Sequence, residues 1–316
     1  MDVIYPAAPL FLLLAPRLLR AQLAPVLDYA SSARWPWPFA PHDLGTYPLA
    51  NGQVYGGGEC TEENQMPVEE TGNMLILLAA LATAEETPAF ALRWWGTLER
   101  WAAYLLDKGM DPENQLCTDD FAGHLAHNMN LSAKAIVALG AFGKLCGMAG
   151  REEEARRYRE AAAAMANRWV EAARDGERTV LAFDRPGTWS QKYNLVWDRV
   201  LGLGLFPPEV TRREVAAYRA QQNRYGLPLD SRADYTKADW VVWSATLAET
   251  EEDFQALIAP LADFLQETPD RVPFTDWYDT KSGRKVGFQA RSVVGGVFVK
   301  MLADPSRWRV WLDRAR

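Results

Sequence analysis

Hydrophobic residues recur at helical spacing along almost the whole chain. Trp94, Leu98 and Trp101, for example, follow one another every three or four residues with charged residues between them, as in an amphipathic helix. Other segments, such as 130–147, are apolar almost all round and are typical of buried helices. The pattern therefore predicts two kinds of helix, one facing water and one enclosed by protein.

The two kinds alternate along the chain. Six inner helices are expected near residues 2–14, 67–84, 130–147, 194–204, 237–248 and 289–303. Six outer helices are expected near residues 16–31, 88–109, 152–174, 209–223, 252–267 and 306–315. Each inner helix passes through a short link into an outer helix, and each outer helix returns through a long loop.

Such an alternation has a simple closed arrangement, an all-α (α/α)6 toroid in which six outer helices surround six inner ones. We expect residues 1–316 to form a single domain of this kind, because no linker or low-complexity tract interrupts the pattern. Short β pieces are expected inside the loops, for example at 179–183. All long loops then lie on one face, at the N-terminal ends of the inner helices.

Composition narrows the function classes. The net charge is −7, with 34 basic and 41 acidic side chains, which argues against a nucleic-acid partner. Hydrophobic residues make up 48% and charged residues 24%, which excludes a disordered chain. The 13 tryptophans either stack on sugars or fill a large core. Five of them lie on the expected loop face, namely Trp35, Trp37, Trp189, Trp240 and Trp277.

No targeting or membrane segment is expected. The apolar stretch 9–15 follows Asp2 rather than a basic run and leads directly into Arg17, so it predicts a buried helix and not a signal peptide. No apolar run approaches the roughly 20 residues of a membrane span. The three cysteines have no metal-ligand spacing and form no disulfide framework, which fits a reducing compartment only weakly. Localisation therefore stays open.

The long loops and the helix starts that follow them hold most of the candidate chemistry. Loops on a rigid scaffold often carry function. Six helix N-termini meeting at one opening would present N–H groups and positive dipole ends that stabilise carboxylates and bind a substrate anion. Acidic residues in a first helical turn are also common caps without further function, so either interpretation holds for any one residue.

Several specific motifs are absent or incomplete. His124 and His127 lack a third histidine, which argues against a metal site. The glycines at 56–58 lack the Lys-Ser/Thr of a phosphate-binding loop, and no Gly-x-Ser-x-Gly elbow occurs. Asp119 and Asp120 are adjacent acids that would suit a Ca²⁺ ion or divided acid and base roles. We expect no cofactor or metal, with Ca²⁺ near this pair as an open alternative.

Six motifs on the expected loop face resemble the helical domain of the glutaminase A family. They are PHDLGTYPLANG (41–52), QMPVEETGN (65–73), TDDFAGHLAHN (118–128), KYNLVWD (192–198), LPLDSR (227–232) and RSVVGG (291–296). The resemblance implies a six-hairpin, glycosidase-like (α/α)6 toroid and hydrolysis of the side-chain amide of glutamine. Family members carry upstream β-rich domains and are often secreted. Relative to them, the chain is expected to be short at its N-terminus.

The leading hypothesis is therefore a metal-independent hydrolase in which one carboxylate activates water and a second acid protonates the leaving group. The acid and base roles are expected among Glu70, Asp120 and Asp279. Substrate contacts are expected from His42, Asp43, Glu69, Asp119, His124, Asn128, Lys192, Trp197, Asp198, Arg232, Lys237, Asp239, Trp240, Asp276, Trp277 and Arg291. Arg232 or Arg291 would hold a substrate carboxylate.

Two alternatives remain. A glycoside hydrolase would use the same paired carboxylates, with the loop tryptophans as sugar platforms. A non-catalytic toroid would only bind its ligand. In each case the expected partner is a small molecule, an amino-acid amide or a sugar, with no nucleic acid or membrane and an undetermined oligomeric state.

Overall fold

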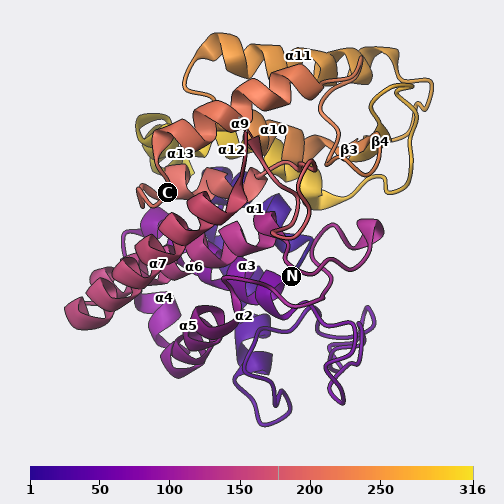
Figure 1. Ribbon diagram of the computed structural model, residues 1–316. Coiled ribbons are helices and arrows are strands. Elements are labelled where there is room, and N and C mark those ends of the chain that lie inside the picture. Colours follow the sequence, from indigo (N-terminus) through magenta and orange to yellow (C-terminus); the bar gives the residue numbers. More distant parts are fainter. Residues whose placement is uncertain (177, 316) are drawn as a thin grey trace.

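The computed structural model describes residues 1–176 and 178–315 and contains the expected six helical hairpins (Figure 1). The inner elements are α1 (Ile4–Leu14), α3 (Pro67–Glu85), α6 (Met129–Met148), η2 (Tyr193–Leu195) leading into α8 (Val196–Leu201), α10 (Ala238–Thr246), and η3 (Ser292–Phe298) leading into α12 (Val299–Leu302). The outer helices are α2 (Pro16–Ala30), α5 (Trp95–Lys108), α7 (Glu152–Ala173), α9 (Pro208–Gln221), α11 (Glu251–Glu267) and α13 (Pro305–Ala315).

The inner elements form a closed ring. Going round it, α1 contacts α3, α3 contacts α6, α6 contacts η2, η2 contacts α10, α10 contacts η3, and η3 returns to α1. The last contact is close because η3 contains Gly295 and Gly296. A Cβ atom on these glycines would lie 2.8 Å from the Ala7 carbonyl oxygen and 2.7 Å from that of Pro6, respectively. The (α/α)6 toroid predicted from the alternation of helices is confirmed.

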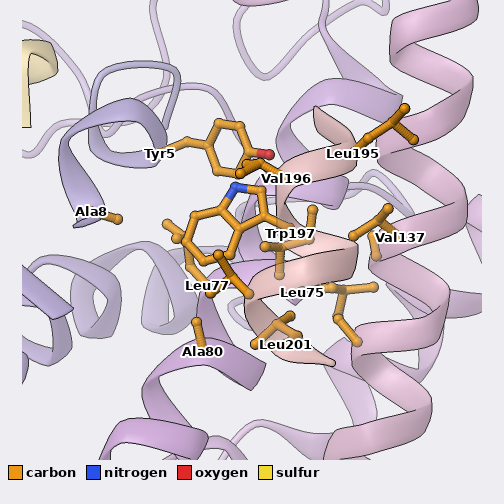
Figure 2. Packing of buried hydrophobic residues seen from close by; sticks show 14 of the residues in the cluster. Tyr5, Ala8, Leu75, Leu77, Ala80, Val137, Leu195, Val196, Trp197 and Leu201 are labelled. Atoms are coloured by element: carbon orange, nitrogen blue, oxygen red, sulfur yellow. The ribbon is translucent and has the colours of Figure 1, made fainter. Parts of the chain in front are cut away.

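Burial follows the predicted division between the two rings. In α3 and α6 nearly every residue is buried, whereas α7 buries one face only. Trp197 lies among inner-helix side chains, including Tyr5, Leu77 and Leu201 (Figure 2). Its ring centroid lies 6.0 Å from that of Tyr5 and 5.6 Å from that of Trp243. The tryptophans of the inner ring therefore build the centre of the core.

Some expected boundaries were wrong. The helix expected at 88–109 is divided into α4 (Ala89–Leu92) and α5, because Arg93 and Trp94 close a turn between them. The helix expected at 194–204 ends at Leu201, where Gly202 adopts a left-handed conformation (φ 62°) that terminates helices. The helix expected from 289 begins only at Ser292, as a 3-10 helix.

Short strands occur within the loops. The β piece expected at 179–183 is shorter and earlier, since β2 (Arg178–Thr179) pairs with β1 (Arg174–Asp175). A second antiparallel pair joins β3 (Tyr235–Lys237) to β4 (Trp277–Asp279), with Lys237 opposite Trp277. This second pair was not predicted. It fastens two long loops together beside the first turn of α10, on the right in Figure 1.

One helix among the described residues passes a length and composition test for a membrane span. Residues Met129–Met148 of α6 have a mean hydropathy of 1.4 over the window, so the expectation that no apolar run approaches such a span was wrong. However, 83% of that window is buried inside the protein. Burial of this kind is the ordinary state of an inner helix in a two-layered ring, which accounts for its apolar character.

Candidate active site

The first turn of α3 holds two buried acids. Pro67 begins the helix, and Glu69 and Glu70 follow in the first turn, where the helix dipole favours carboxylates. Glu70 is fully buried; its Oε2 accepts a hydrogen bond from Asn73 Nδ2 at 3.0 Å, and its Oε1 has no partner. Burial raises the pKa of Glu70 from 4.5 to about 7. Such a carboxyl group can hold a proton near neutral pH and give it away.

The neighbouring Glu69 is in a different state. Its Oε1 accepts hydrogen bonds from Lys134 Nζ of α6 and from Thr118 Oγ1 of the preceding loop. Lys134 also lies over the ring of Tyr5, 4.0 Å from its centroid. All four side chains are buried. Glu69 therefore has its charge neutralised by a buried cation, whereas Glu70 beside it does not.

A histidine lies between two carboxylates near Glu70. His42 Nδ1 lies 3.2 Å from Asp43 Oδ2, and His42 Nε2 lies 3.7 Å from Asp2 Oδ1. Burial alone would lower the pKa of His42, but the two hydrogen-bonded acids raise it to about 9. Asp43 accepts N–H groups of Gly45, Val54 and Tyr55, and these with His42 outweigh its burial and lower its pKa to about 2. His42 therefore carries a positive charge at neutral pH.

This pair predicts a pH-dependent stability. The raised pKa of His42 contributes stability that is complete below about pH 6.5 and disappears as the pH rises towards 9. The lowered pKa of Asp43 contributes stability above about pH 3.8 that disappears as the pH falls towards 2. We expect His42→Gln to lower Tm at pH 5–6 and the deficit to shrink between pH 6.5 and 9. Thermal melts across this range measure it, and a deficit independent of pH would contradict the assignment.

Tyr55 connects this group to the acidic loop. Its ring stacks on His42 with a centroid distance of 3.9 Å, and its hydroxyl donates to Asp120 Oδ2 at 3.0 Å. Burial, followed by the negative charges of Asp120, Asp2 and Glu70, raises the pKa of Tyr55. The aromatic side chain of Tyr55 thus lies within the electrostatic reach of both Glu70 and Asp120. Of the three predicted catalytic acids, Asp120 contacts Tyr55 directly and Glu70 acts on it through its charge.

Asp119 contacts residues of two other inner hairpins. Its two oxygens accept hydrogen bonds from Tyr193 Oη (2.7 Å) and Trp240 Nε1 (2.9 Å), and these two rings stack in parallel with centroids 4.0 Å apart. Burial raises the pKa of Asp119, although Lys237 opposes the shift. Asp119 and Asp120 are adjacent in the chain, but they contact different partners: Asp119 contacts Tyr193 and Trp240, whereas Asp120 contacts Tyr55.

Lys237 and Asp239 form a buried ion pair at the start of α10. Lys237 Nζ lies 3.2 Å from Asp239 Oδ2 and 4.5 Å from the Trp240 ring centroid. Neither oxygen of Asp239 has a hydrogen bond of good geometry. Burial raises the pKa of Asp239 to about 6 despite Lys237. Its carboxylate thus keeps unused hydrogen-bonding capacity in the interior.

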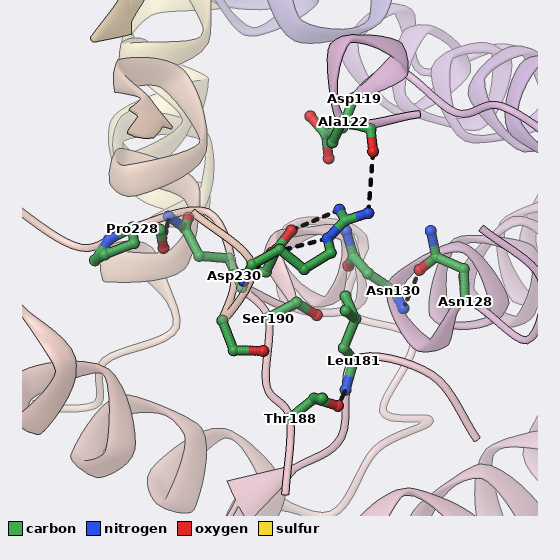
Figure 3. A network of polar contacts seen from close by, with 12 residues as sticks. Asp119, Ala122, Asn128, Asn130, Leu181, Thr188, Ser190, Pro228 and Asp230 are labelled. Atoms are coloured by element: carbon green, nitrogen blue, oxygen red, sulfur yellow. Dashed lines mark hydrogen bonds and ion pairs between the residues drawn. The ribbon is translucent and has the colours of Figure 1, made fainter. Parts of the chain in front are cut away.

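The two arginines expected to hold a substrate carboxylate are each paired with an acid of the protein. Arg291 contacts Asp276 through Nε (3.3 Å) and Nη2 (2.5 Å). Arg232 donates hydrogen bonds from Nε and Nη2 to the Asp230 carboxylate, and its Nη1 donates to the Ala122 carbonyl at 3.1 Å (Figure 3). The second arrangement anchors η1 (Asp120–Ala122), the short helix that carries Asp120.

Partly exposed aromatic rings lie beside Asp120. Phe121 contacts Trp277 with a centroid distance of 4.4 Å and Tyr235 at 5.5 Å. Trp277 contacts Phe288 at 5.1 Å, and the Arg291 guanidinium lies over the Phe288 ring at 3.7 Å. Trp277 was predicted at this face, whereas Trp197 and Trp240 are fully buried.

Other predicted site residues are engaged elsewhere. Asp279 accepts the N–H groups of Lys281 and Ser282 in its own turn, and Asp198 accepts those of Leu205 and Phe206 beyond the end of α8. Both carboxylates stabilise the local backbone. Within the described residues, neither of them contacts Glu70. Their predicted roles at the site therefore gain no support from the geometry.

Three further predicted residues also have local partners or lie apart. Asn128 caps α6 by accepting the N–H groups of Asn130 and Leu131. Lys192 is buried and donates to Ser190 Oγ (2.8 Å) and the Ser190 carbonyl (3.0 Å), and burial lowers its pKa to about 8. His124 is exposed beside a small surface cavity lined by Glu113 and other polar residues.

Sequence reasoning missed several members of the site. They are Asp2, Tyr55, Asn73, Thr118, Lys134 and Tyr193. One signal was available: Lys134 stands within an otherwise apolar inner helix, and a charged residue there needs a buried partner. The partners of Asp2 and Tyr55 come from loops distant in sequence, which no spacing rule connects.

Among residues 1–176 and 178–315, no group of three or more His, Cys, Asp or Glu side chains has the geometry to hold a metal ion. The Ca²⁺ alternative near Asp119 and Asp120 gains no support, because their carboxylates face different partners. That the reaction needs no metal or cofactor stays a prediction.

The chain was compared with known proteins. A family model described as the glutaminase A six helical-hairpin domain matches residues 1–301. Glutaminase A of Aspergillus oryzae is 36% identical over 309 residues, which cover 95% of this chain and 44% of that protein. A probable glutaminase of Arthroderma benhamiae is 28% identical, with 94% and 44% covered. The chain thus spans less than half the length of these relatives.

Solved structures share the fold at low identity. A glycosidase variant in complex with glucose superposes with a TM-score of 0.60 at 13% identity, over 98% of this chain and 86% of that one. An uncharacterised conserved protein from Thermus thermophilus gives a TM-score of 0.60 at 10% identity, over 95% and 91%. These likenesses support the six-hairpin ring and no particular substrate.

Proposed function

Because the chain belongs to the glutaminase A six-hairpin family, whose domain model covers residues 1–301, we propose that it is a hydrolase that cleaves the side-chain amide of glutamine or a related small amide. One observation carries the proposal. Glu70 is buried with its Oε1 unpaired, the partly exposed Asp120 accepts a hydrogen bond from Tyr55, and the charges of both acids raise the pKa of Tyr55. Two carboxyl groups in such different environments suit an acid and a base.

In the proposed reaction, Asp120 takes a proton from water while the water oxygen attacks the amide carbon. Glu70 gives its proton to the amide nitrogen, the C–N bond breaks, and ammonia leaves. A carboxylic acid remains on the product, and the proton taken up by Asp120 restores Glu70. The pKa of Glu70 at about 7 keeps it able both to donate and to regain a proton near neutral pH.

Substrate binding follows from which cations keep free donors. Arg291 is 23% exposed and uses Nε and Nη2 on Asp276, so its Nη1 is available for the α-carboxylate of a substrate. Arg232 uses one N–H of each of its three nitrogens on Asp230 and Ala122, so none of its nitrogens is wholly free. We therefore assign the carboxylate contact to Arg291 rather than to Arg232.

A glycoside hydrolase is the second candidate. Phe121, Trp277 and Phe288 form a partly exposed aromatic surface next to Asp120, and aromatic faces of this kind bind sugar rings. The same acid and base would then act on a glycosidic bond. The family relationship favours the amide, whereas this surface favours the sugar.

The deciding assay measures ammonia release from glutamine beside a panel of aryl glycosides, with the wild-type chain and Glu70→Gln. We expect ammonia from glutamine that depends on Glu70, and no release of aryl alcohol. Glycoside turnover without ammonia would replace the first candidate by the second. Binding without turnover of either substrate would indicate a non-catalytic toroid and overturn both.

A further inference from the structure

A continuous chain of buried polar contacts leads from the loop before α6 to Glu70. Lys134 Nζ donates both to Glu69 Oε1 and, at 2.7 Å, to Asn73 Oδ1. Asn73 Nδ2 then donates to Glu70 Oε2 at 3.0 Å. Glu69, Glu70, Asn73 and Lys134 are each no more than 1% exposed. Water therefore has little access to any of these hydrogen bonds.

The chemistry of these groups dictates the orientation of Asn73. An ammonium group has only donors, so the amide atom that faces Lys134 must be the oxygen. The NH2 group of Asn73 must then face Glu70, and the Glu70 oxygen that receives it must act as an acceptor. Turning the amide over would set NH2 against ammonium and break both contacts. The orientation is thus imposed by Lys134, which is held by Glu69, and Glu69 in turn accepts a hydrogen bond from Thr118.

We propose that Lys134 and Asn73 are positioning residues that confine the proton of Glu70 to Oε1, the oxygen without a protein partner. The inference rests on the proposed function, in which Glu70 is the general acid. A protonated carboxyl group has one hydroxyl oxygen and one carbonyl oxygen. Since Asn73 donates to Oε2, that oxygen stays the carbonyl and the hydroxyl forms on Oε1. The acid is then oriented before the substrate arrives.

The packing of α3 against α6 is adapted to this path. At Gly72, between Glu70 and Asn73, an added Cβ would lie 2.7 Å from Lys134 Cγ and 3.0 Å from its Cδ. Any larger residue at this position would displace the aliphatic part of Lys134. The missing side chain of Gly72 therefore lets Lys134 pass α3 and reach Glu69 directly and Glu70 through Asn73.

Asn73→Asp tests the orientation with a side chain of nearly the same volume. The aspartate keeps an acceptor for Lys134 but has no N–H for Glu70, and its charge disfavours the glutamate carboxylate. We expect the basic limb of the kcat–pH profile to move up by about one pH unit and kcat to fall about tenfold, with KM within about twofold because no substrate contact is removed. Ser132→Ala, in α6, removes only a hydrogen bond to the Met110 carbonyl and should keep the wild-type profile.

The double variant Glu69→Gln/Lys134→Met is the second test. It removes both charges together, so that neither is left buried without a partner, and it frees the Asn73 amide to turn. We expect kcat to fall about tenfold, again with KM within about twofold. Either folded variant with wild-type kcat and an unshifted pH profile would overturn the proposal.

Infrared difference spectra of the wild type against Glu70→Gln test it without activity. Below pH 6 the carbonyl band of protonated Glu70 should lie at the lowered frequency of a hydrogen-bonded C=O group, and Asn73→Leu should raise it. A free carbonyl band in the wild type would overturn the positioning role. If the wild type hydrolyses neither substrate but shows the expected band, the proposed function fails and the positioning role stands.

Discussion

Glu70→Gln is expected to lower kcat by about 10²- to 10⁴-fold, the range that one general acid contributes, while the protein stays folded. Glutamine has nearly the same shape as glutamic acid and stays neutral. Its side-chain oxygen can still accept the hydrogen bond from Asn73. The variant therefore removes the transferable proton and little else. Single-turnover kinetics at pH 6–8 measure the loss, and wild-type turnover would exclude Glu70 as the acid.

The same variant has a stability signature with a definite sign. Burial raises the pKa of Glu70 from 4.5 to about 7, so between these values the native protein holds a proton that the unfolded chain has released. The stability contribution of Glu70 therefore falls as the pH rises through this window. Glu70→Gln, which does not titrate, should gain Tm relative to the wild type from pH 4.5 to 7. Glu160→Gln, on the exposed side of α7, should change neither Tm nor kcat.

Trp197→Ala is expected to destabilise the protein by about 3–5 kcal/mol, the usual cost of removing a large buried aromatic side chain. The ring is fully buried among Tyr5, Leu77, Leu201 and their neighbours (Figure 2), and no outer helix can move in to fill the gap without opening the ring. For a protein of this size we expect Tm to fall by on the order of 10 °C. Differential scanning calorimetry measures this.

The sequence had placed Trp197 among the substrate contacts, so the variant also separates two roles. If Trp197 only packs the core, Trp197→Phe should recover much of the lost Tm and leave KM unchanged at a temperature where both proteins are folded. Trp311→Ala, at a half-buried position of α13, should lose less Tm than Trp197→Ala. A large rise in KM with Tm preserved would instead support contact with substrate.

The fold could be predicted because its signal is repeated six times. Each inner helix is apolar around its circumference and each outer helix is apolar on one face, so local periodicity identifies the layer. A few misplaced boundaries, as at Gly202, do not change the number of hairpins. The β3–β4 pair escaped prediction because three-residue strands lie in loops about 40 positions apart and have no periodicity long enough to detect.

The site was predictable only in part. Glu70, Asp120 and His42 follow from their position at helix starts and in long loops; the structure places His42 and Asp120 in contact with Tyr55, and the charge of Glu70 acts on the same tyrosine. Asp279 and Asp198 have the same type of position in the sequence, yet each stabilises the backbone of its own turn. An aspartate that caps a turn and an aspartate that reacts with substrate are the same residue in the sequence, and only their contacts in the structure distinguish them.

The amino-acid order alone was sufficient for the number of hairpins, for the layering of the helices and for the loops on which polar and aromatic residues collect, because these depend on neighbours within a few residues. Three-dimensional packing was needed to assign a state to each charged group. Glu69 and Glu70 are adjacent in the chain, but Lys134 reaches across Gly72 to neutralise one and, through Asn73, to orient the other. Whether a carboxylate is paired, protonated or free depends on burial and on partners as far as 121 positions away, as for Asp119 and Trp240, and no local pattern carries that information.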